Sequence, residues 1–155
     1  MENKDKCYVK FCVLGAPQTG KSSIIERYVD DLFVPSHHPY ANIGVQFRTK
    51  NIDFGEKICV VQMWDHCHPI DIFIVGSKCD LQSKRVIGRE EAIEYANQHA
   101  SQYFEVSSKD NINIQQKFDE LASKYFDSQL NDPLYQQHPL PQQRPPPSRW
   151  SCSMQ

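Results

Sequence analysis

The sequence lacks the marks of several classes of protein. No apolar run approaches the ~20 residues that a membrane-spanning helix needs, and residues 1–6 do not have the pattern of a secretory signal peptide. The 155 residues carry 17 Lys and Arg against 19 Asp and Glu, a net charge of −2. This balance argues against binding nucleic acid by general electrostatic attraction. We therefore expect a cytoplasmic protein with no nucleic-acid partner.

The cysteines do not form the pattern of a disulfide framework. Five of the six are scattered between residues 7 and 79. Since nothing marks the chain for export, we expect reduced thiols in a cytoplasmic protein. The five positions are Cys7, Cys12, Cys59, Cys67 and Cys79.

The composition divides the chain into two parts. Residues 131–155 hold six of the ten prolines and five glutamines. Such a segment cannot bury enough apolar surface to offset the entropy lost on ordering, so it is predicted to be a disordered tail. Residues 1–130 are predicted to form the folded domain.

Hydrophobic patterning predicts strands that alternate with helices in this domain. Apolar residues at helical spacing follow Ser22, Gly88 and Asn113, and apolar runs of strand length lie between them. This alternation is typical of an α/β protein with a mainly parallel sheet and flanking helices. The predicted strands are residues 8–14, 43–52, 57–64, 70–76 and 103–106, with a hairpin turn at 53–56.

Residues 15–22 (GAPQTGKS) match the phosphate-binding pattern G-x-x-x-x-G-K-[ST]. They follow a predicted strand and precede a predicted helix, which is the context that this motif requires. The glycines would let backbone N–H groups surround phosphate oxygens at the positive end of the helix dipole. Lys21 would reach the terminal phosphates, and the Ser22 hydroxyl would bind Mg²⁺. A chance glycine turn before a helix is the alternative, and the matching context on both sides argues against it.

Five further segments follow this loop in order: residues 27–31 (RYVDD), 43–47 (IGVQF), 60–65 (VVQMWD), 75–81 (VGSKCDL) and 105–109 (EVSSK). Together with the loop they resemble motifs of the Ras superfamily of small GTPases, and within it of the Rab branch. The resemblance covers residues 7–128. It implies a small G-protein-like P-loop NTPase fold, a GTPase that binds GTP or GDP with Mg²⁺, and a switch in vesicle traffic.

The resemblance also implies roles for individual residues. Lys21 would stabilise the phosphates, and Ser22, Asn42 and Asp65 would bind Mg²⁺. Asp80 suits guanine because its two carboxylate oxygens can accept hydrogen bonds from the N1–H and N2–H₂ groups of that base. The residues expected to bind the nucleotide are Gly15, Gly20, Lys21, Ser22, Ser23, Phe33, Lys78, Asp80, Ser107, Ser108 and Lys109.

Two expectations concern partners and membranes. Ile43, Phe47 and Trp64 lie where Rab proteins contact effectors, although burial in the core is an equal alternative for Phe47 and Trp64. Residues 152–155 (CSMQ) fit the prenylation pattern C-a-a-X, which makes Cys152 a candidate for farnesylation. A single lipid would hold the protein weakly and reversibly at the cytosolic face of a membrane.

Several positions depart from the family pattern. Asn42 stands where the family has the Thr of switch I, and His68 and Pro69 stand where it has the Gly and Gln of switch II. Because that Gln orients the attacking water, we expect impaired hydrolysis. Ser77 replaces an Asn, and we expect the loss of a tether to the phosphate loop.

The largest departure is an absence. Only residues 66–69 join the match to the family's third strand to residues 70–76, which match its fifth. The switch II helix, the fourth strand and the third helix of the family have no counterpart, which indicates an internal deletion. Because a parallel crossover needs a dozen residues or more, four residues favour a hairpin. A hairpin would reverse residues 70–76 and place Asp80 about 20 Å from the phosphate loop.

Two functions therefore stay open. The first is a Rab-like small GTPase with impaired hydrolysis. The second is a non-catalytic, truncated pseudo-GTPase that acts only through protein contacts, with an affinity for GTP far below that of an intact family member. A different P-loop phosphotransferase is a remote third, since nothing outside residues 15–22 favours it.

Overall fold

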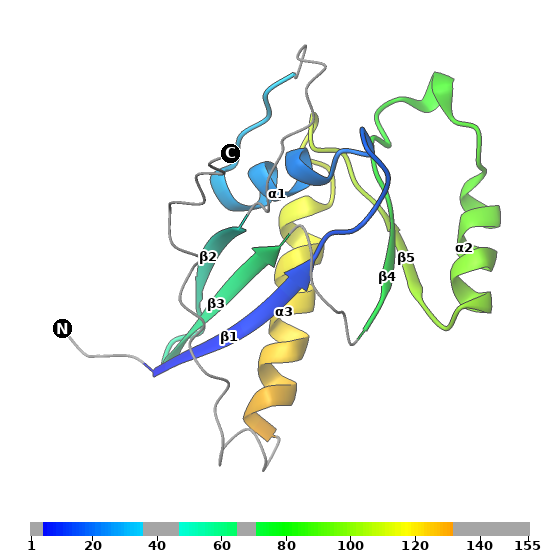
Figure 1. Ribbon diagram of the computed structural model, residues 1–155. Coiled ribbons are helices and arrows are strands. Elements are labelled where there is room, and N and C mark those ends of the chain that lie inside the picture. The colour runs from blue at the N-terminus through cyan, green and yellow to red at the C-terminus, as the bar shows by residue number, and fades with distance from the viewer. Residues whose placement is uncertain (1–4, 36–46, 65–70, 132–155) are drawn as a thin grey trace, which may run out of the picture.

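The computed structural model describes residues 5–35, 47–64 and 71–131, and it has the predicted order of strands and helices (Figure 1). None of the helices in these ranges is both long and apolar enough to cross a membrane. The predicted tail lies almost wholly outside the described residues. The elements are β1 (Asp5–Cys12), α1 (Lys21–Asp30), β2 (Phe47–Asp53), β3 (Lys57–Trp64), β4 (Phe73–Gly76), the short 3₁₀ helix η1 (Gln82–Lys84), α2 (Arg89–Gln98), β5 (Gln102–Glu105) and α3 (Ile114–Asn131).

The first sheet has three strands in the order β1-β3-β2. β1 runs parallel to β3, and β2 runs antiparallel to β3. The turn between β2 and β3 lies where the sequence predicted a hairpin. Gly55 adopts a φ of 82°, and its N–H donates to Oδ1 of Asp53 at 2.9 Å. An aspartate that accepts from the backbone two residues on, followed by a left-handed glycine, is the chemistry that a tight turn favours.

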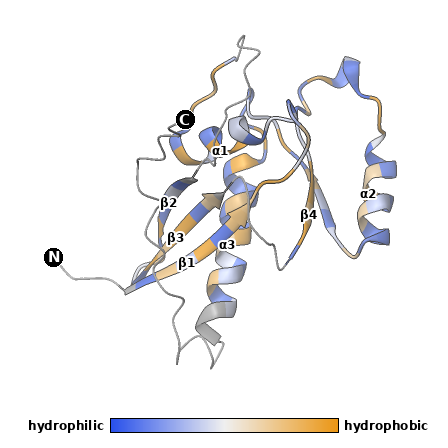
Figure 2. Cartoon of the chain, viewed as in Figure 1, coloured by the Kyte–Doolittle hydropathy of each residue, from blue (hydrophilic) through white to orange (hydrophobic). Residues whose placement is uncertain are grey.

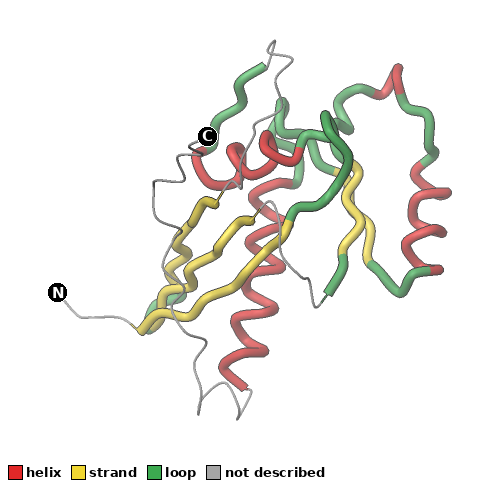
Figure 3. The backbone as a smooth tube through the Cα atoms, viewed as in Figure 1, coloured by secondary structure: helices red, strands yellow, loops and turns green. Residues whose placement is uncertain are grey.

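The second sheet contains the parallel pair β4-β5, with α2 connecting the two strands (Figure 3). The expected hairpin between residues 57–64 and 70–76 is therefore wrong, because β4 pairs with β5 and not with β3 in the described part of the chain. β4 begins at Phe73 and has only four residues. The connection from Trp64 is thus eight residues long, and its nine steps can span about 30 Å. This span is long enough for the chain to run back along the length of the four-residue strand β4, which is about 13 Å, before β4 begins.

α3 packs against both sheets and joins them through aromatic side chains. The ring of Phe118 lies 5.8 Å from Phe11 of β1 and 6.3 Å from Phe104 of β5, measured between centroids. The ring of Tyr125 lies 6.5 Å from Phe11 and 6.4 Å from Phe73 of β4. Apolar residues line β1, β3 and β4, whereas α2 is largely polar (Figure 2). One core, centred on α3, therefore serves both sheets.

The cysteines only partly match the expected reduced state. Cys7 and Cys59 are Cα partners across β1 and β3, and both are buried free thiols. Burial raises the pKa of the Cys59 thiol to about 12, so this thiol stays protonated. Cys79 is also free. Cys12 is disulfide-bonded, which corrects the expectation for that residue.

Candidate nucleotide-binding site

The phosphate loop connects β1 to α1, and a side chain at either of its two glycines would be sterically strained. Gly15 has a φ of 154°, and a Cβ atom at this position would lie 3.1 Å from Oγ1 of Thr19. Gly20 has a φ of 96° in the left-handed region and is the N-cap of α1. The Thr19 hydroxyl donates to the carbonyl of Ala16 at 2.9 Å, which closes the loop on itself. Any side chain at Gly20 would be strained at this φ.

The beginning of α1 has the features of an anion site. The N-cap residue Gly20 provides no side-chain hydrogen bond to the start of the helix, and the first turn of α1 contains no acidic residue. The backbone N–H groups of Lys21, Ser22 and Ser23 have no acceptor among the described residues. The Lys21 ammonium donates to the carbonyl of Ala16 at 3.0 Å, on the same loop. Uncapped N–H groups at the positive end of a helix, with a lysine beside them, suit a phosphate group.

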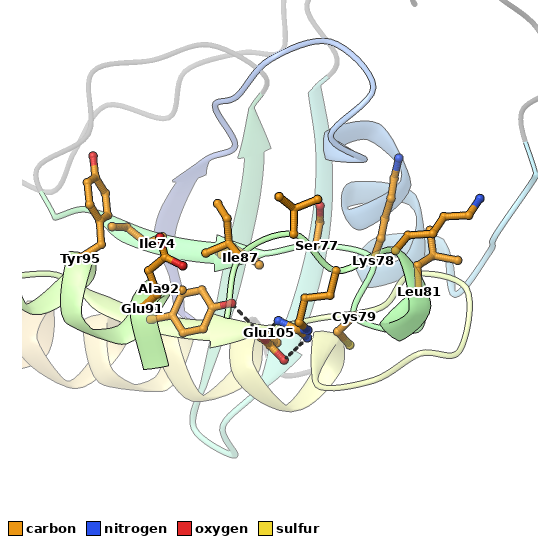
Figure 4. A pocket seen from close by; sticks show the side chains of 16 residues that line it. Ile74, Ser77, Lys78, Cys79, Leu81, Ile87, Glu91, Ala92, Tyr95 and Glu105 are labelled. Atoms are coloured by element: carbon orange, nitrogen blue, oxygen red, sulfur yellow. Dashed lines mark hydrogen bonds and ion pairs between the residues drawn. The ribbon is translucent and has the colours of Figure 1, made fainter. Parts of the chain in front are cut away.

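The segment after β4 is bound directly to the phosphate loop. The Ser77 hydroxyl donates to the carbonyl of Thr19 at 2.5 Å, and Nζ of Lys78 donates to the carbonyl of Gln18 at 2.6 Å. Figure 4 shows both side chains on the segment that leaves β4. The expected loss of a tether at Ser77 is therefore wrong, because the hydroxyl supplies one. The expectation that the two halves of the site lie far apart is also wrong.

Asp80 is held by the loop that follows β5. Oγ of Ser107 donates to Oδ1 of Asp80 at 2.7 Å and accepts a hydrogen bond from the N–H of Asp110 at 3.1 Å. Ser107 and Ser108 are buried, whereas Lys109 is exposed. Asp80 makes no other hydrogen bond within the ranges that the structure describes. Its second carboxylate oxygen is thus available to a ligand.

The remaining predicted site residues are less well defined by the structure. Phe33 is half-buried just beyond α1. Phe47 and Trp64 are Cα partners across β2 and β3, and their side chains are not described. The residues that lie outside the described ranges are Asn42, Ile43, Asp65, His68, Pro69 and Cys152.

A pocket of about 690 Å³ lies beside this region, between β4, α2 and the segment that joins them (Figure 4). Apolar side chains such as Ile74 and Ile87 line it. At one side the Arg85 guanidinium binds both carboxylate oxygens of Glu105, at 2.7 and 3.1 Å. This pairing holds the pKa of Glu105 below its usual range. Burial, together with a hydrogen bond to the same carboxylate, raises the pKa of Tyr103.

Sequence reasoning missed one residue that contacts the site. The Arg27 side chain reaches from α1 to the backbone carbonyl of Ser108, 81 positions along the chain, at 2.8 Å. Arg27 lies in a segment that carries the family resemblance, but the sequence assigned it no role, because the contact depends on how α1 packs beside the loop after β5.

Two family models match the chain. The model of the Ras family matches residues 66–127, and the model of Roc, the "Ras of Complex" domain of DAPkinase, matches residues 10–69. Their shared residues are 66–69, which is where the sequence indicated an internal deletion.

Similar proteins point to the same family. Ras-related protein Rab-3C from Bos taurus is 24% identical over 196 residues, which cover 92% of this chain and 86% of the relative. Ras-related protein Rab-3A from Homo sapiens is 25% identical over 159 residues, which cover 73% of this chain and 71% of the relative. The alignment with Rab-3C exceeds the 155 residues of this chain, so at least 41 aligned positions have no residue here. The chain is thus similar to small GTPases of the Ras superfamily, and to Rab proteins among them, and the sequence indicates an internal truncation between β3 and β4.

Proposed function

We propose that this protein binds GDP or GTP together with Mg²⁺ in a site formed by the phosphate loop, residues 77–80 and residues 107–109. The observation that carries the proposal is the pair of hydrogen bonds from Ser77 and Lys78 to carbonyls of the phosphate loop. These bonds hold the expected phosphate-binding and base-binding segments against each other. One nucleotide can therefore contact both segments.

On the phosphate side, the free N–H groups at the start of α1 bind phosphate oxygens, as Gly15 and Gly20 allow the backbone to approach closely. Lys21 exchanges its hydrogen bond to Ala16 for one to a phosphate oxygen. The Ser22 hydroxyl holds Mg²⁺, which neutralises charge on the phosphates when bound. Asn42 and Asp65 are the proposed further ligands, through oxygen atoms of the kind that Mg²⁺ prefers.

On the base side, Asp80 accepts from N1–H and N2–H₂ of guanine. Ser107 orients this carboxylate through the hydrogen bond at 2.7 Å. The aliphatic part of Lys78 lies along the base, and Phe33 packs against its edge. Backbone N–H groups in residues 107–109 bind the base carbonyl. Adenine lacks the donor pair that Asp80 recognises, so guanine is preferred.

Hydrolysis is proposed to be slow, because Pro69 has no side-chain group that can orient a water molecule. The protein would then stay bound to its nucleotide for a long time while it acts in vesicle traffic. Ile43, Phe47 and Trp64 are its proposed effector contacts, and a farnesyl group on Cys152 is its proposed membrane anchor. A non-catalytic protein that binds partners without nucleotide is the second candidate, favoured by the at least 41 aligned positions of Rab-3C (196 − 155) that have no residue in this chain.

The nucleotide content of the purified chain tests this proposal. The protein is purified with Mg²⁺ present and then denatured, and any released nucleotide is identified by chromatography. We expect one GDP or GTP per chain. In Asp80→Asn one carboxylate oxygen becomes a donor that opposes N2–H₂, so guanine nucleotide should be lost while pyrophosphate still binds. An empty wild-type chain that also fails to bind added GDP would contradict the proposal and leave the non-catalytic protein.

A further inference from the structure

Arg27 in α1 connects that helix to the loop between β5 and α3. Its side chain is only 14% exposed. Nε donates to the carbonyl of Ser108 at 2.8 Å, and Nη2 lies 3.4 Å from the carbonyl of Lys109. Nη1 donates to the backbone carbonyl and to Oδ1 of Asp31, at 2.8 and 3.0 Å. The guanidinium thus uses three nitrogens, in the rigid planar fork that lysine cannot reproduce.

The loop that Arg27 contacts has a conformation that needs support. Asn111 and Asn113 have φ values of 54° and 60°, both in the left-handed region. Two backbone hydrogen bonds between Ser107 and Ile112 close the loop at its base. The Asn111 amide also donates to Oδ1 of Asp31, at 3.3 Å. The loop is therefore held from outside by the end of α1.

The contact with Arg27 continues through a chain of hydrogen bonds to Asp80. The carbonyl of Lys109 and the N–H of Asp110 belong to one planar peptide unit and point in opposite directions. Arg27 approaches the carbonyl, and the N–H donates to Oγ of Ser107. That hydroxyl then directs its own hydrogen to Oδ1 of Asp80. The orientation of the peptide unit decides whether the Ser107 hydroxyl is free to donate to the carboxylate.

The same end of α1 is also fixed to the beginning of α3. Nε2 of Gln115 donates to the backbone carbonyls of Arg27 and Tyr28, at 3.0 and 3.1 Å. Figure 1 shows the first turns of α3 beside α1. Arg27 therefore projects from a backbone that is itself held in place.

We propose that Arg27 is a positioning residue for base recognition: it orients the peptide units of residues 108–110, and through Ser107 it orients the Asp80 carboxylate. This inference rests on the proposed guanine-nucleotide function. Because α1 begins at the phosphate-binding residues, Arg27 also couples the phosphate segment to the base segment through one rigid helix.

The test compares Arg27→Lys with a matched control, Arg48→Lys. Arg48 also forms ion pairs with acidic residues of α1, Asp30 and Glu26, but it does not contact the loop after β5. Affinities for GDP and for inorganic pyrophosphate are measured by calorimetry with Mg²⁺. We expect the Kd for GDP to rise at least about tenfold in Arg27→Lys, since hydrogen bonds from a charged donor are lost. The Kd for pyrophosphate should stay within about twofold, and Arg48→Lys should change neither.

Unchanged GDP affinity in Arg27→Lys would overturn the inference. Equal losses for GDP and pyrophosphate would also overturn it, because they would indicate a general loss of structure. Melting temperatures of both variants are measured to check that each is folded.

Hydrogen exchange of the nucleotide-free protein separates this inference from the proposed function. We expect faster exchange of the amides in residues 107–112 in Arg27→Lys, and unchanged exchange in Arg48→Lys. If the wild type binds no guanine nucleotide, the proposed function fails and, with it, the role in base recognition. The exchange result then still decides whether Arg27 anchors the loop, and unchanged exchange would refute that as well.

Discussion

The two sheets differ in how completely their apolar residues are buried. In the three-stranded sheet, Val61 and Met63 have no exposed surface, and α1 and α3 cover the face on which they lie. Around the two-stranded sheet, Val86 is 95% exposed and Tyr95 is 56% exposed. This open region adjoins β4, the strand that follows the internal deletion indicated by the sequence at residues 66–69. Burial of apolar residues is thus more complete around the three-stranded sheet than around the two-stranded sheet.

The difference also shows why the candidate site can persist in a truncated chain. The site is built from loops at the carboxyl ends of β1, β4 and β5, and polar contacts connect those loops directly. Ser77 and Lys78 bind the phosphate loop, and Ser107 binds Asp80. α3 packs against both sheets through the ring of Phe118. All of these contacts join residues within the described ranges, so they form without the family elements that this chain lacks.

The largest effect is expected at the residue that joins the two sheets. Phe118 is 6% exposed and its ring contacts rings in both sheets. Phe118→Ala should therefore lower the free energy of unfolding by about 3–5 kcal/mol, measured by urea denaturation. Tyr95→Ala on α2 is the matched aromatic control, with an expected change within about 0.5 kcal/mol. Similar losses in the two variants would show that the core is not centred on α3.

Much of this architecture could be predicted from the sequence, because the signals are local. The helical stripe of apolar residues after Asn113 predicted the buried face of α3. Four of its five residues are buried, namely Ile114, Phe118, Leu121 and Ala122, and the fifth, Tyr125, is partly buried. The phosphate loop was likewise predicted from eight consecutive residues, and its position between β1 and α1 follows the prediction.

The predictions that are wrong concern features that depend on distances in the folded chain. The strand predicted over residues 70–76 begins only at Phe73. The connection from β3 is therefore three residues longer than predicted, and this extra length replaces the expected hairpin by a connection to a strand of another, parallel pair. The tether from Ser77 exists only because β4 ends within reach of Thr19. The helix face predicted for α2 is mostly exposed, with only Ala96 buried, because helical periodicity does not reveal whether another segment packs on that face.

A smaller effect, which depends on pH, is expected at the polar side of the open region. The bond from Arg85 lowers the pKa of Glu105 in the folded state. A carboxylate of this kind stabilises the fold above its unfolded pKa of about 4.3, and this stabilisation is lost as pH falls through the folded pKa. The urea midpoint of Glu105→Gln should therefore lie below that of the wild type at pH 7, and the two should converge toward pH 3. Glu94→Gln, on the exposed surface of α2, is the control; a constant difference for Glu105→Gln across this range would contradict the assignment.

The smallest effect on stability is expected at the exposed apolar residues themselves. Ile87 is 57% exposed and lines the pocket of about 690 Å³, as does Val86. Replacing either by Ser removes little buried surface, so the free energy of unfolding should change by less than about 0.5 kcal/mol. The same change makes the pocket more polar, so the fluorescence of a bound apolar dye such as anilinonaphthalene sulfonate should fall. Leu32→Ser, at a residue that is 58% exposed beyond α1, should leave the fluorescence unchanged. A clear loss of stability in Ile87→Ser would mean that this face is covered in solution, and the contrast between the two sheets would then not hold.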